Sequence, residues 1–208
     1  MWVFPPTVFD LNVADMSLLF DVAPFVFMFL IPAITMRQIA EEKKTGTIEL
    51  LMTKPLSTWA LVGGKYLASL TLVILALLPT SIFYVSIYQL GSPIGNIDSS
   101  AVIGSYLGLI LLATVFTAVG ILSSAMTSNQ IIAFIIGLFF CFVLYSWFGF
   151  LADSISSSSS YYIRYLSLNY HYNALSKGVL DSRNLVYILS WTIGLLFVAR
   201  FLIEKIKK

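Results

Sequence analysis

The sequence predicts an all-α membrane helix bundle that forms a single transmembrane domain over residues 1–208. Hydrophobic residues make up 59% of the chain and charged residues 11%, and the mean hydropathy is +0.91. A typical soluble domain has about 25% charged residues. Between positions 66 and 163 there is no Lys or Arg, and the only acidic residues are Asp98 and Asp153. Such a composition is typical of a polypeptide segment that lies within a lipid bilayer.

Five apolar segments are long enough to cross a membrane, because a hydrocarbon core of about 30 Å needs about 20 helical residues. They are residues 17–36, 66–90, 101–125, 131–151 and 185–203. The first contains Asp21, Pro24 and Pro32. Because proline lacks the N–H that a helix interior requires, we expect Pro24 to lie in the first turn, with Asp21 outside the helix and away from hydrocarbon.

The positions of the basic residues predict the orientation. They gather in the loop 37–65 and around the end of the fifth segment: Arg37, Lys43, Lys44, Lys54 and Lys65, then Arg200, Lys205, Lys207 and Lys208. The loops 91–100 and 126–130 contain no Lys or Arg. Because cytoplasmic loops are enriched in these residues, we expect a multi-pass membrane protein with a defined orientation. The 37–65 loop and the C-terminus would both be cytoplasmic.

The same path places residues 152–184 outside the cytoplasm. This segment carries basic residues and many tyrosines: Arg164, Lys177 and Arg183, with Tyr161, Tyr162, Tyr165, Tyr170 and Tyr172. Tyrosine suits a membrane–water interface, because its ring packs on acyl chains while its hydroxyl reaches water. We expect an extracytoplasmic amphipathic or partly re-entrant element, with the serine run 156–160 as a flexible hinge.

The 37–65 loop has the pattern of a short helix that follows a break. Gly46 is costly inside a helix, so we expect the chain to turn there. Thr47 would cap the next helix, Glu49 would lie in its first turn, and Pro55 would end it. One apolar face is predicted, formed by Ile48, Leu51 and Met52. Such a helix either docks into a groove of a cytoplasmic partner or rests on lipid headgroups.

The loop also resembles a known family. The pattern Glu42-x-x-x-Gly46-Thr47-x-Glu49-x-Leu51, followed by Lys54-Pro55 and Gly64-Lys65-Tyr66, is similar to the cytoplasmic signature of type-two, export-type ABC transporter permeases. The resemblance implies that this loop is the coupling helix that docks onto an ABC ATP-binding subunit. The docking residues would be Glu42, Gly46, Thr47, Ile48, Glu49, Leu51, Met52 and Pro55. A second permease subunit, in a homo- or heterodimer, is also implied.

Two details refine this resemblance. The segments 40–51, 88–98, 167–172 and 177–181 are similar to the gliding-motility permease family GldF of Bacteroidetes, which implies a role in surface gliding. The family normally has six spans, and the start Met1-Trp2-Val3-Phe4-Pro5 is typical of the tail of an apolar helix. We therefore expect the first of six spans to be missing.

The sequence does not predict an enzyme, a cofactor or a metal site. It has no phosphate-binding loop: Gly63-Gly64-Lys65 lacks the first glycine at the required spacing. ATP hydrolysis is therefore expected only in a separate subunit. His171 and Cys141 are the single residues of their types, and Cys141 is expected to serve packing. We expect the bilayer as a partner and no nucleic acid.

Small polar residues and glycines in the spans indicate helix packing. Gly104 and Gly108 form a small-x-x-x-small pair, and Asp98 is expected in a polar turn. Two alternatives stay open beside the permease. A secondary transporter or channel would need ionisable residues or broken helices at mid-membrane depth. A non-transporting anchor would recruit an ATPase through the same loop.

Overall fold

The computed structural model describes residues 16–53, 55–91, 94–154, 160–178 and 181–206, and all regular structure in these ranges is helical. The elements are α2 (Ser17–Thr35), α3 (Arg37–Thr45), α4 (Thr47–Thr53), α5 (Thr58–Leu77), the 3₁₀ turn η1 (Leu78–Thr80), α6 (Ser81–Leu90), α7 (Ser99–Met126), α8 (Gln130–Phe142), the π-helical segment η2 (Val143–Trp147), α9 (Phe148–Ser154), α10 (Ser160–Tyr165), α11 (Leu168–Ser176) and α12 (Ser182–Ile206).

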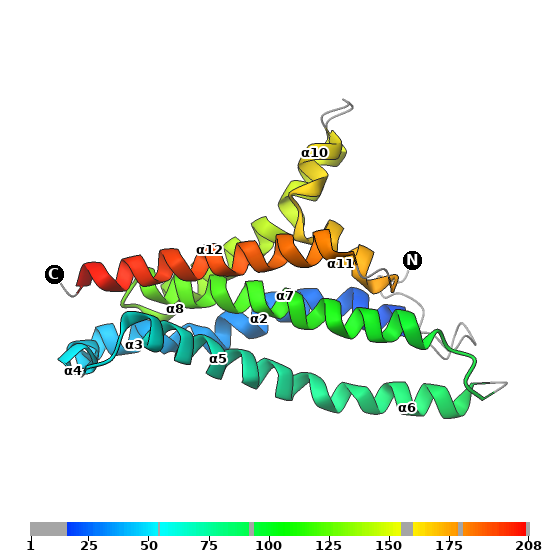
Figure 1. Cartoon of the computed structure of the whole chain (residues 1–208), viewed down its shortest axis with the longest axis horizontal. Coiled ribbons are helices and arrows are strands. Elements are labelled where there is room, and N and C mark those ends of the chain that lie inside the picture. The colour runs from blue at the N-terminus through cyan, green and yellow to red at the C-terminus, as the bar shows by residue number, and fades with distance from the viewer. Residues whose placement is uncertain (1–15, 54, 92–93, 155–159, 179–180, 207–208) are drawn as a thin grey trace.

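The predicted bundle of five spans is confirmed. Five helical stretches are long and apolar enough to cross a membrane: Ser17–Thr45, Thr58–Leu90, Ser99–Met126, Gln130–Ser154 and Ser182–Lys205. They run lengthwise side by side, with α4 and the C-terminal end of α12 at one end of the bundle and α6 at the other (Figure 1). The end that carries α4 is called the α4 end below.

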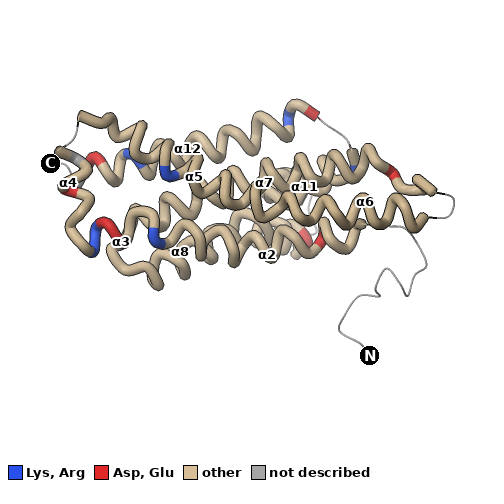
Figure 2. The backbone as a smooth tube through the Cα atoms, turned by 90° about the horizontal axis from the view of Figure 1, so that it is seen from below, with Lys and Arg blue, Asp and Glu red and all other residues tan. Residues whose placement is uncertain are grey.

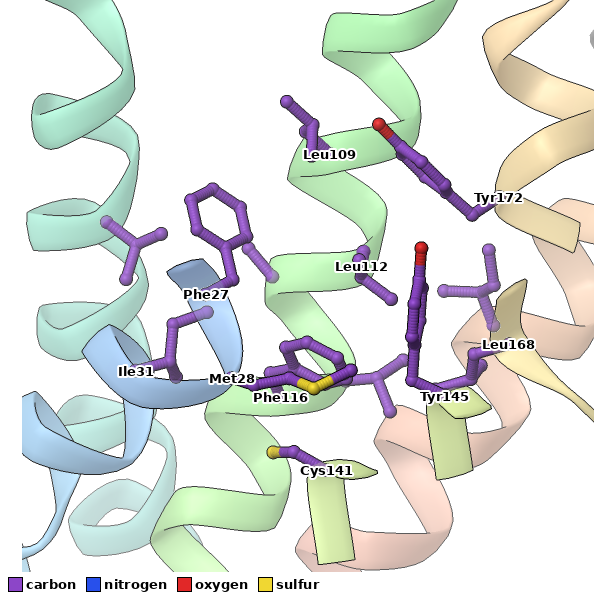
Figure 3. Packing of buried hydrophobic residues seen from close by; sticks show 14 of the residues in the cluster. Phe27, Met28, Ile31, Leu109, Leu112, Phe116, Cys141, Tyr145, Leu168 and Tyr172 are labelled. Atoms are coloured by element: carbon purple, nitrogen blue, oxygen red, sulfur yellow. The ribbon is translucent and has the colours of Figure 1, made fainter. Parts of the chain in front are cut away.

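Helix α7 lies at the centre of the bundle. Its most apolar stretch is 78% buried, against 39% or less for the other four spans. It contacts α2, α5, α8, α11 and α12, and the side chains around it form the main core (Figure 3). The labelled residues in that view are Phe27, Met28 and Ile31 of α2, Leu109, Leu112 and Phe116 of α7, Cys141 of α8, Tyr145 of η2, and Leu168 and Tyr172 of α11. The expected packing role of Cys141 is confirmed, because it is fully buried in this core.

Glycines let the neighbouring helices approach α7 closely. A Cβ on Gly120 would lie 2.0 Å from the Thr35 hydroxyl oxygen of α2, and one on Gly104 would lie 2.7 Å from the Leu175 carbonyl of α11. A Cβ on Gly108 would also contact Leu175, at 3.3 Å from its Cβ. The predicted packing role of the Gly104–Gly108 pair is therefore confirmed.

The expectation for the start of the first span is wrong. Helix α2 begins at Ser17, so Pro24 lies well inside it and Asp21 is part of the helix. Proline at position 24 cannot donate the usual hydrogen bond to the carbonyl four residues earlier, on Phe20. The Tyr172 hydroxyl of α11 donates to that carbonyl instead, at 2.7 Å. A side chain 152 positions away thus allows the helix to continue through Pro24.

The 91–100 loop contains the predicted polar turn. Asp98 caps α7, and its Oδ1 accepts hydrogen bonds from the N–H groups of Ala101 (3.2 Å) and Ser100 (3.0 Å). The bond from Ala101, followed by that from the Ser100 side chain, lowers the pKa of Asp98. The start of α7 is also tied to the preceding span, because the hydroxyls of Tyr84 on α6 and Ser99 lie 2.8 Å apart.

The 152–184 segment forms short helices in two arrangements. Helices α9 and α10 pack on each other and project from the bundle, whereas α11 lies along it (Figure 1). His171 on α11 is fully buried, 2.7 Å from Asn184 Oδ1 and 2.8 Å from the Tyr165 carbonyl, and stacks on Tyr187 at 4.1 Å. Residues 155–159 of the expected serine hinge lie outside the described residues. The extracytoplasmic placement stays a prediction.

Replacing Tyr172 by Phe should destabilise the bundle. The change removes the side-chain donor to the Phe20 carbonyl and keeps the aromatic ring in the core. A buried acceptor left without its donor costs about 1–3 kcal/mol, so we expect a lower thermal unfolding midpoint in detergent. Tyr162→Phe is the control, because Tyr162 is 74% exposed. Equal midpoints for the two variants would contradict the role given to Tyr172.

Candidate partner-docking site

A single serine of α7 fixes the junction between α2 and α3. The Ser124 hydroxyl oxygen accepts hydrogen bonds from the N–H groups of Ile39 and Ala40, both at 3.0 Å, and donates to the Met36 carbonyl at 3.0 Å. These backbone groups lie at the ends of two helices, where partners within the helix are lacking. Ser124 therefore ties the first turn of α3 to the central helix.

A largely buried ion pair joins α3 to α5. Lys65 Nζ lies 2.5 Å from Glu42 Oε1 and also donates to the Gln38 carbonyl. The side chains of Lys65 and Glu42 are 14% and 24% exposed. The second oxygen, Glu42 Oε2, is buried and has no hydrogen-bond partner among the described residues. Because breaking such a pair leaves a charge without compensation, α3 and α5 are held in one position.

Gly46 makes the predicted break between two helices. It has φ 74° and ψ 0°, a left-handed conformation that favours glycine, and it ends α3. The expectation that Thr47 caps the second helix is wrong, because Thr47 is already the first residue of α4. The chain reversal turns its side chain back over α3, where its hydroxyl donates to the Glu42 carbonyl at 3.5 Å and contacts the Thr45 hydroxyl at 2.9 Å.

The inner side of α4 is anchored in a second apolar core. Ile48 is 3% exposed. It packs with residues of α3, α5, α7 and α12, namely Ile39, Val62, Ile121, Leu122, Ala125, Ala199 and Ile203. Leu51 is half-buried, and the side chain of Met52 lies outside the described residues. Ile48 thus faces the interior of its own chain, which corrects the expectation that it is offered to a partner.

The outer side of α4 exposes a different set of side chains. Glu49 and Leu50 are exposed, Leu50 by 67%, and Pro55 and Leu56 are exposed just after the helix. Leu50 and Leu56 were missed from the sequence. Once Ile48 faces inward, the helical spacing alone turns positions 49, 50 and 53 outward, and this is the signal that could have found Leu50.

Other helix ends complete the surface around α4. Arg37 Nε of α3 donates to Gln130 Oε1 of α8 at 3.2 Å. Arg200 of α12 lies over the Trp59 ring of α5, 5.0 Å from its centroid. Many of the charged residues of the described chain lie on the helices at this end (Figure 2). The α4 end is therefore a charged, cross-connected surface with one outward apolar side chain on its short helix.

Replacing Ser124 by Ala should loosen this end of the bundle. The change removes three hydrogen bonds from buried or partly buried backbone groups, and each lost partner costs about 1 kcal/mol or more. We expect faster hydrogen exchange in α3 and a lower unfolding midpoint. Ser123→Ala is the matched control, since the Ser123 hydroxyl bonds only to Gly120 within α7. Unchanged exchange in α3 would contradict the role of Ser124.

Comparison with known proteins supplies the family. Residues 10–205 match the model of the family described as ABC-2 family transporter protein. No curated protein matches this sequence. The match spans nearly the whole chain and covers the helices described above, α12 up to residue 205. The chain therefore belongs to the ABC-2 family of transporter proteins and is a permease-type, multi-pass membrane component.

Proposed function

We propose that this chain is the membrane-spanning subunit of an ATP-driven exporter and that the outer face of α4 docks onto a separate ATP-binding subunit. The observation that carries the proposal is that α4 is buried on one side and exposed on the other. Ile48 is held in a core made by four helices, while Glu49 and Leu50 are exposed at the tip of the bundle. An exposed apolar anchor beside a charge suits a groove on a partner.

The packing of α4 supports coupling as well as docking. Ile48 belongs to one buried cluster with residues of α3, α5, α7 and α12, so a displacement of α4 would be passed through this cluster to the ends of these helices. Ser124 and Lys65 add hydrogen bonds from α7 and α5 to α3. Because packed cores move between discrete arrangements and do not deform continuously, ATP-driven closure of a docked partner would shift the helix ends together.

The orientation follows from the charges. Arg37, Lys43 and Lys44 lie on α3, next to α4. Lys65 pairs with Glu42 of α3, and Lys205 lies in the last turn of α12, so these five basic residues are all at the α4 end. By the bias of basic residues toward the cytoplasm, we place the α4 end and the C-terminus on the cytoplasmic side of a bacterial inner membrane. The 152–184 segment then lies on the outer side.

The proposed assembly contains two permease subunits and two ATPases, as in the family that the loop resembles. The α6 helix has no fully buried residue in the described chain, and only Tyr84 and Ile87 pack against the main core. The rest of its surface is free for lipid or for the second permease, identical or different. ATP would be bound and hydrolysed only by the ATPase subunits. The gliding-motility role rests only on the sequence resemblance of residues 40–51, 88–98, 167–172 and 177–181, and we keep it as part of the proposal.

Capture of an ATP-binding subunit tests the docking face. We expect the full chain, co-expressed in membranes with candidate ATP-binding subunits, to co-purify with one of them. Glu49→Lys should weaken capture about tenfold or more, since reversing a charge in an interface costs at least about 1.4 kcal/mol. Arg183→Glu is the control, because Arg183 is exposed at the other end of the bundle. Equal capture by both variants, or none by the intact chain, would refute the docking face.

A second measurement separates a permease from a passive anchor. Cys141 is buried, so a Tyr162→Cys variant carries one accessible thiol on α10. In the complex with its ATPase, a permease should show an ATP-dependent change in the labelling rate of that thiol. Adding Ile48→Ala should abolish the change while the complex remains, because the contact that passes the movement on is lost. A labelling rate that is independent of ATP would favour the anchor.

A further inference from the structure

Two adjoining cavities lie far from α4, where α2, η2, α9 and α11 meet. One has a volume of about 380 Å³ and includes Asp21 and Tyr145 in its lining. The other has a volume of about 600 Å³ and includes Arg164 and Lys177. Both are within the size range of small-molecule sites. They share Gly149, Asp153, Asn169 and Asn173 in their walls, and so form one double cavity.

The charges of the double cavity are separated. Asp153 and Arg164 form an ion pair with each other. Asp21, which lines only the smaller cavity, and Lys177, which lines only the larger one, form no ion pair or hydrogen bond among the described residues. An ionisable residue within a membrane span is costly and marks a functional site by default. One unpaired carboxylate and one unpaired ammonium thus remain at opposite parts of the same space.

The smaller cavity suits an organic ammonium group. Its wall combines the Asp21 carboxylate with the Ser146 hydroxyl and the amide oxygens of Asn169 and Asn173, all of which accept hydrogen bonds. Aromatic rings complete the wall, and those of Phe25 and Tyr145 lie 5.9 Å apart, edge to face. A cation is attracted both by carboxylates and by the faces of such rings.

The larger cavity suits an anion. Lys177 brings a compact positive charge, and Arg164 brings a guanidinium whose donors exceed the two oxygens of Asp153. Phosphate oxygens form strong hydrogen bonds with both kinds of cation. The amide groups of Asn169 and Asn173, one helical turn apart on α11, face both cavities and can also donate.

The π-helical segment points to a ligand independently of these charges. Val143–Trp147 interrupts the fourth span and brings Tyr145 and Ser146 to the wall of the smaller cavity. Single π-helical turns occur often at functional sites. The Tyr145 carbonyl accepts a hydrogen bond from the Ser167 hydroxyl at 2.6 Å. The distortion is therefore stabilised by the helix that carries Asn169 and Asn173.

We propose that the double cavity binds a zwitterionic phosphoethanolamine headgroup, with its ammonium at Asp21 and its phosphate at Lys177. The apolar side chains of α2 beside Asp21, Val22 and Phe25, are about half exposed (47% and 52%), and provide a surface for acyl chains. The ligand is accordingly a membrane phospholipid, although a soluble phosphoethanolamine has the same headgroup chemistry. The site stands on its own, whether or not an ATPase docks on α4.

The test compares the lipids that the full chain retains. The protein is reconstituted in bilayers with equal amounts of phosphatidylethanolamine and phosphatidylglycerol, extracted in mild detergent and analysed by native mass spectrometry. We expect phosphatidylethanolamine to be enriched among the retained lipids. Asp21→Asn should lower this enrichment about tenfold, the usual effect of losing a hydrogen bond to a charged group. Lys177→Gln should instead lower the total amount of retained phospholipid by a similar factor, because both lipids carry the phosphate.

Matched controls and a second variant make the result decisive. Glu41→Gln and Lys44→Gln remove charges from α3, at the opposite end of the bundle, and should leave the enrichment unchanged. Asn173→Ala, which keeps both unpaired charges, should lower it less than Asp21→Asn does. Equal retention of the two lipids by the intact chain, unchanged enrichment in Asp21→Asn, or unchanged total retention in Lys177→Gln would overturn the proposal.

A soluble arm distinguishes the two sources of the headgroup. Glycerophosphoethanolamine is added in excess during extraction. If it displaces the lipid from the intact chain, both molecules use the same headgroup site. If it binds with an Asp21-dependent affinity while no lipid is retained, the ligand is a soluble zwitterion, and the lipid assignment is overturned.

Discussion

The arrangement of the whole chain depends on how closely its other helices can approach α7. Gly120 leaves room for the Thr35 side chain of α2, and Gly104 leaves room for the backbone of α11. In a bilayer, helices gain little from the hydrophobic effect on meeting one another, so close van der Waals contact between small residues provides much of the attraction. These contacts fix α2 and α11 on α7, and with them both the junction to α3 and the wall of the double cavity.

The second constraint is that backbone polar groups within apolar surroundings need partners. Three irregular positions meet it with hydroxyl groups from distant helices. Tyr172 donates to the carbonyl left free by Pro24. Ser124 donates to the Met36 carbonyl at the α2–α3 junction, and Ser167 donates to the Tyr145 carbonyl in the π-helical segment. Each hydroxyl permits a bend or a break that the local sequence alone would make costly, and each lies beside one of the two proposed sites.

The sequence predicted what depends on local pattern. The five spans follow from hydropathy, the turn at Gly46 from the cost of glycine in helices, and the close packing at Gly104 and Gly108 from residue size. All three are properties of a segment and its own side chains. The predicted docking role of the loop is a different kind of statement, because it concerns a second molecule, and it stays a proposal.

The features that the sequence did not predict depend on distant partners. The helical position of Asp21 requires the hydroxyl of Tyr172, which no periodicity within α2 reveals. Which side of α4 faces inward depends on the buried cluster around Ile48, which includes residues of four other helices. An amphipathic pattern identifies an apolar face, but it does not say whether the chain itself or a partner covers that face. Leu50 was missed for the same reason.

The positions of the two proposed sites connect them mechanically. Helices α2 and α3 run in nearly continuous succession from Asp21 to Gly46, and the part from Asp21 to Arg37 is about 24 Å long at the usual rise per residue. A shift of α4 that moves α3 would act on this rod. The rod is bent most easily at Pro24 and Pro32, where backbone hydrogen bonds are missing. Because the Tyr172 hydroxyl of α11 bonds to the Phe20 carbonyl next to Asp21, α2 and α11 would move together at this end, and the bend would be taken up at the two prolines.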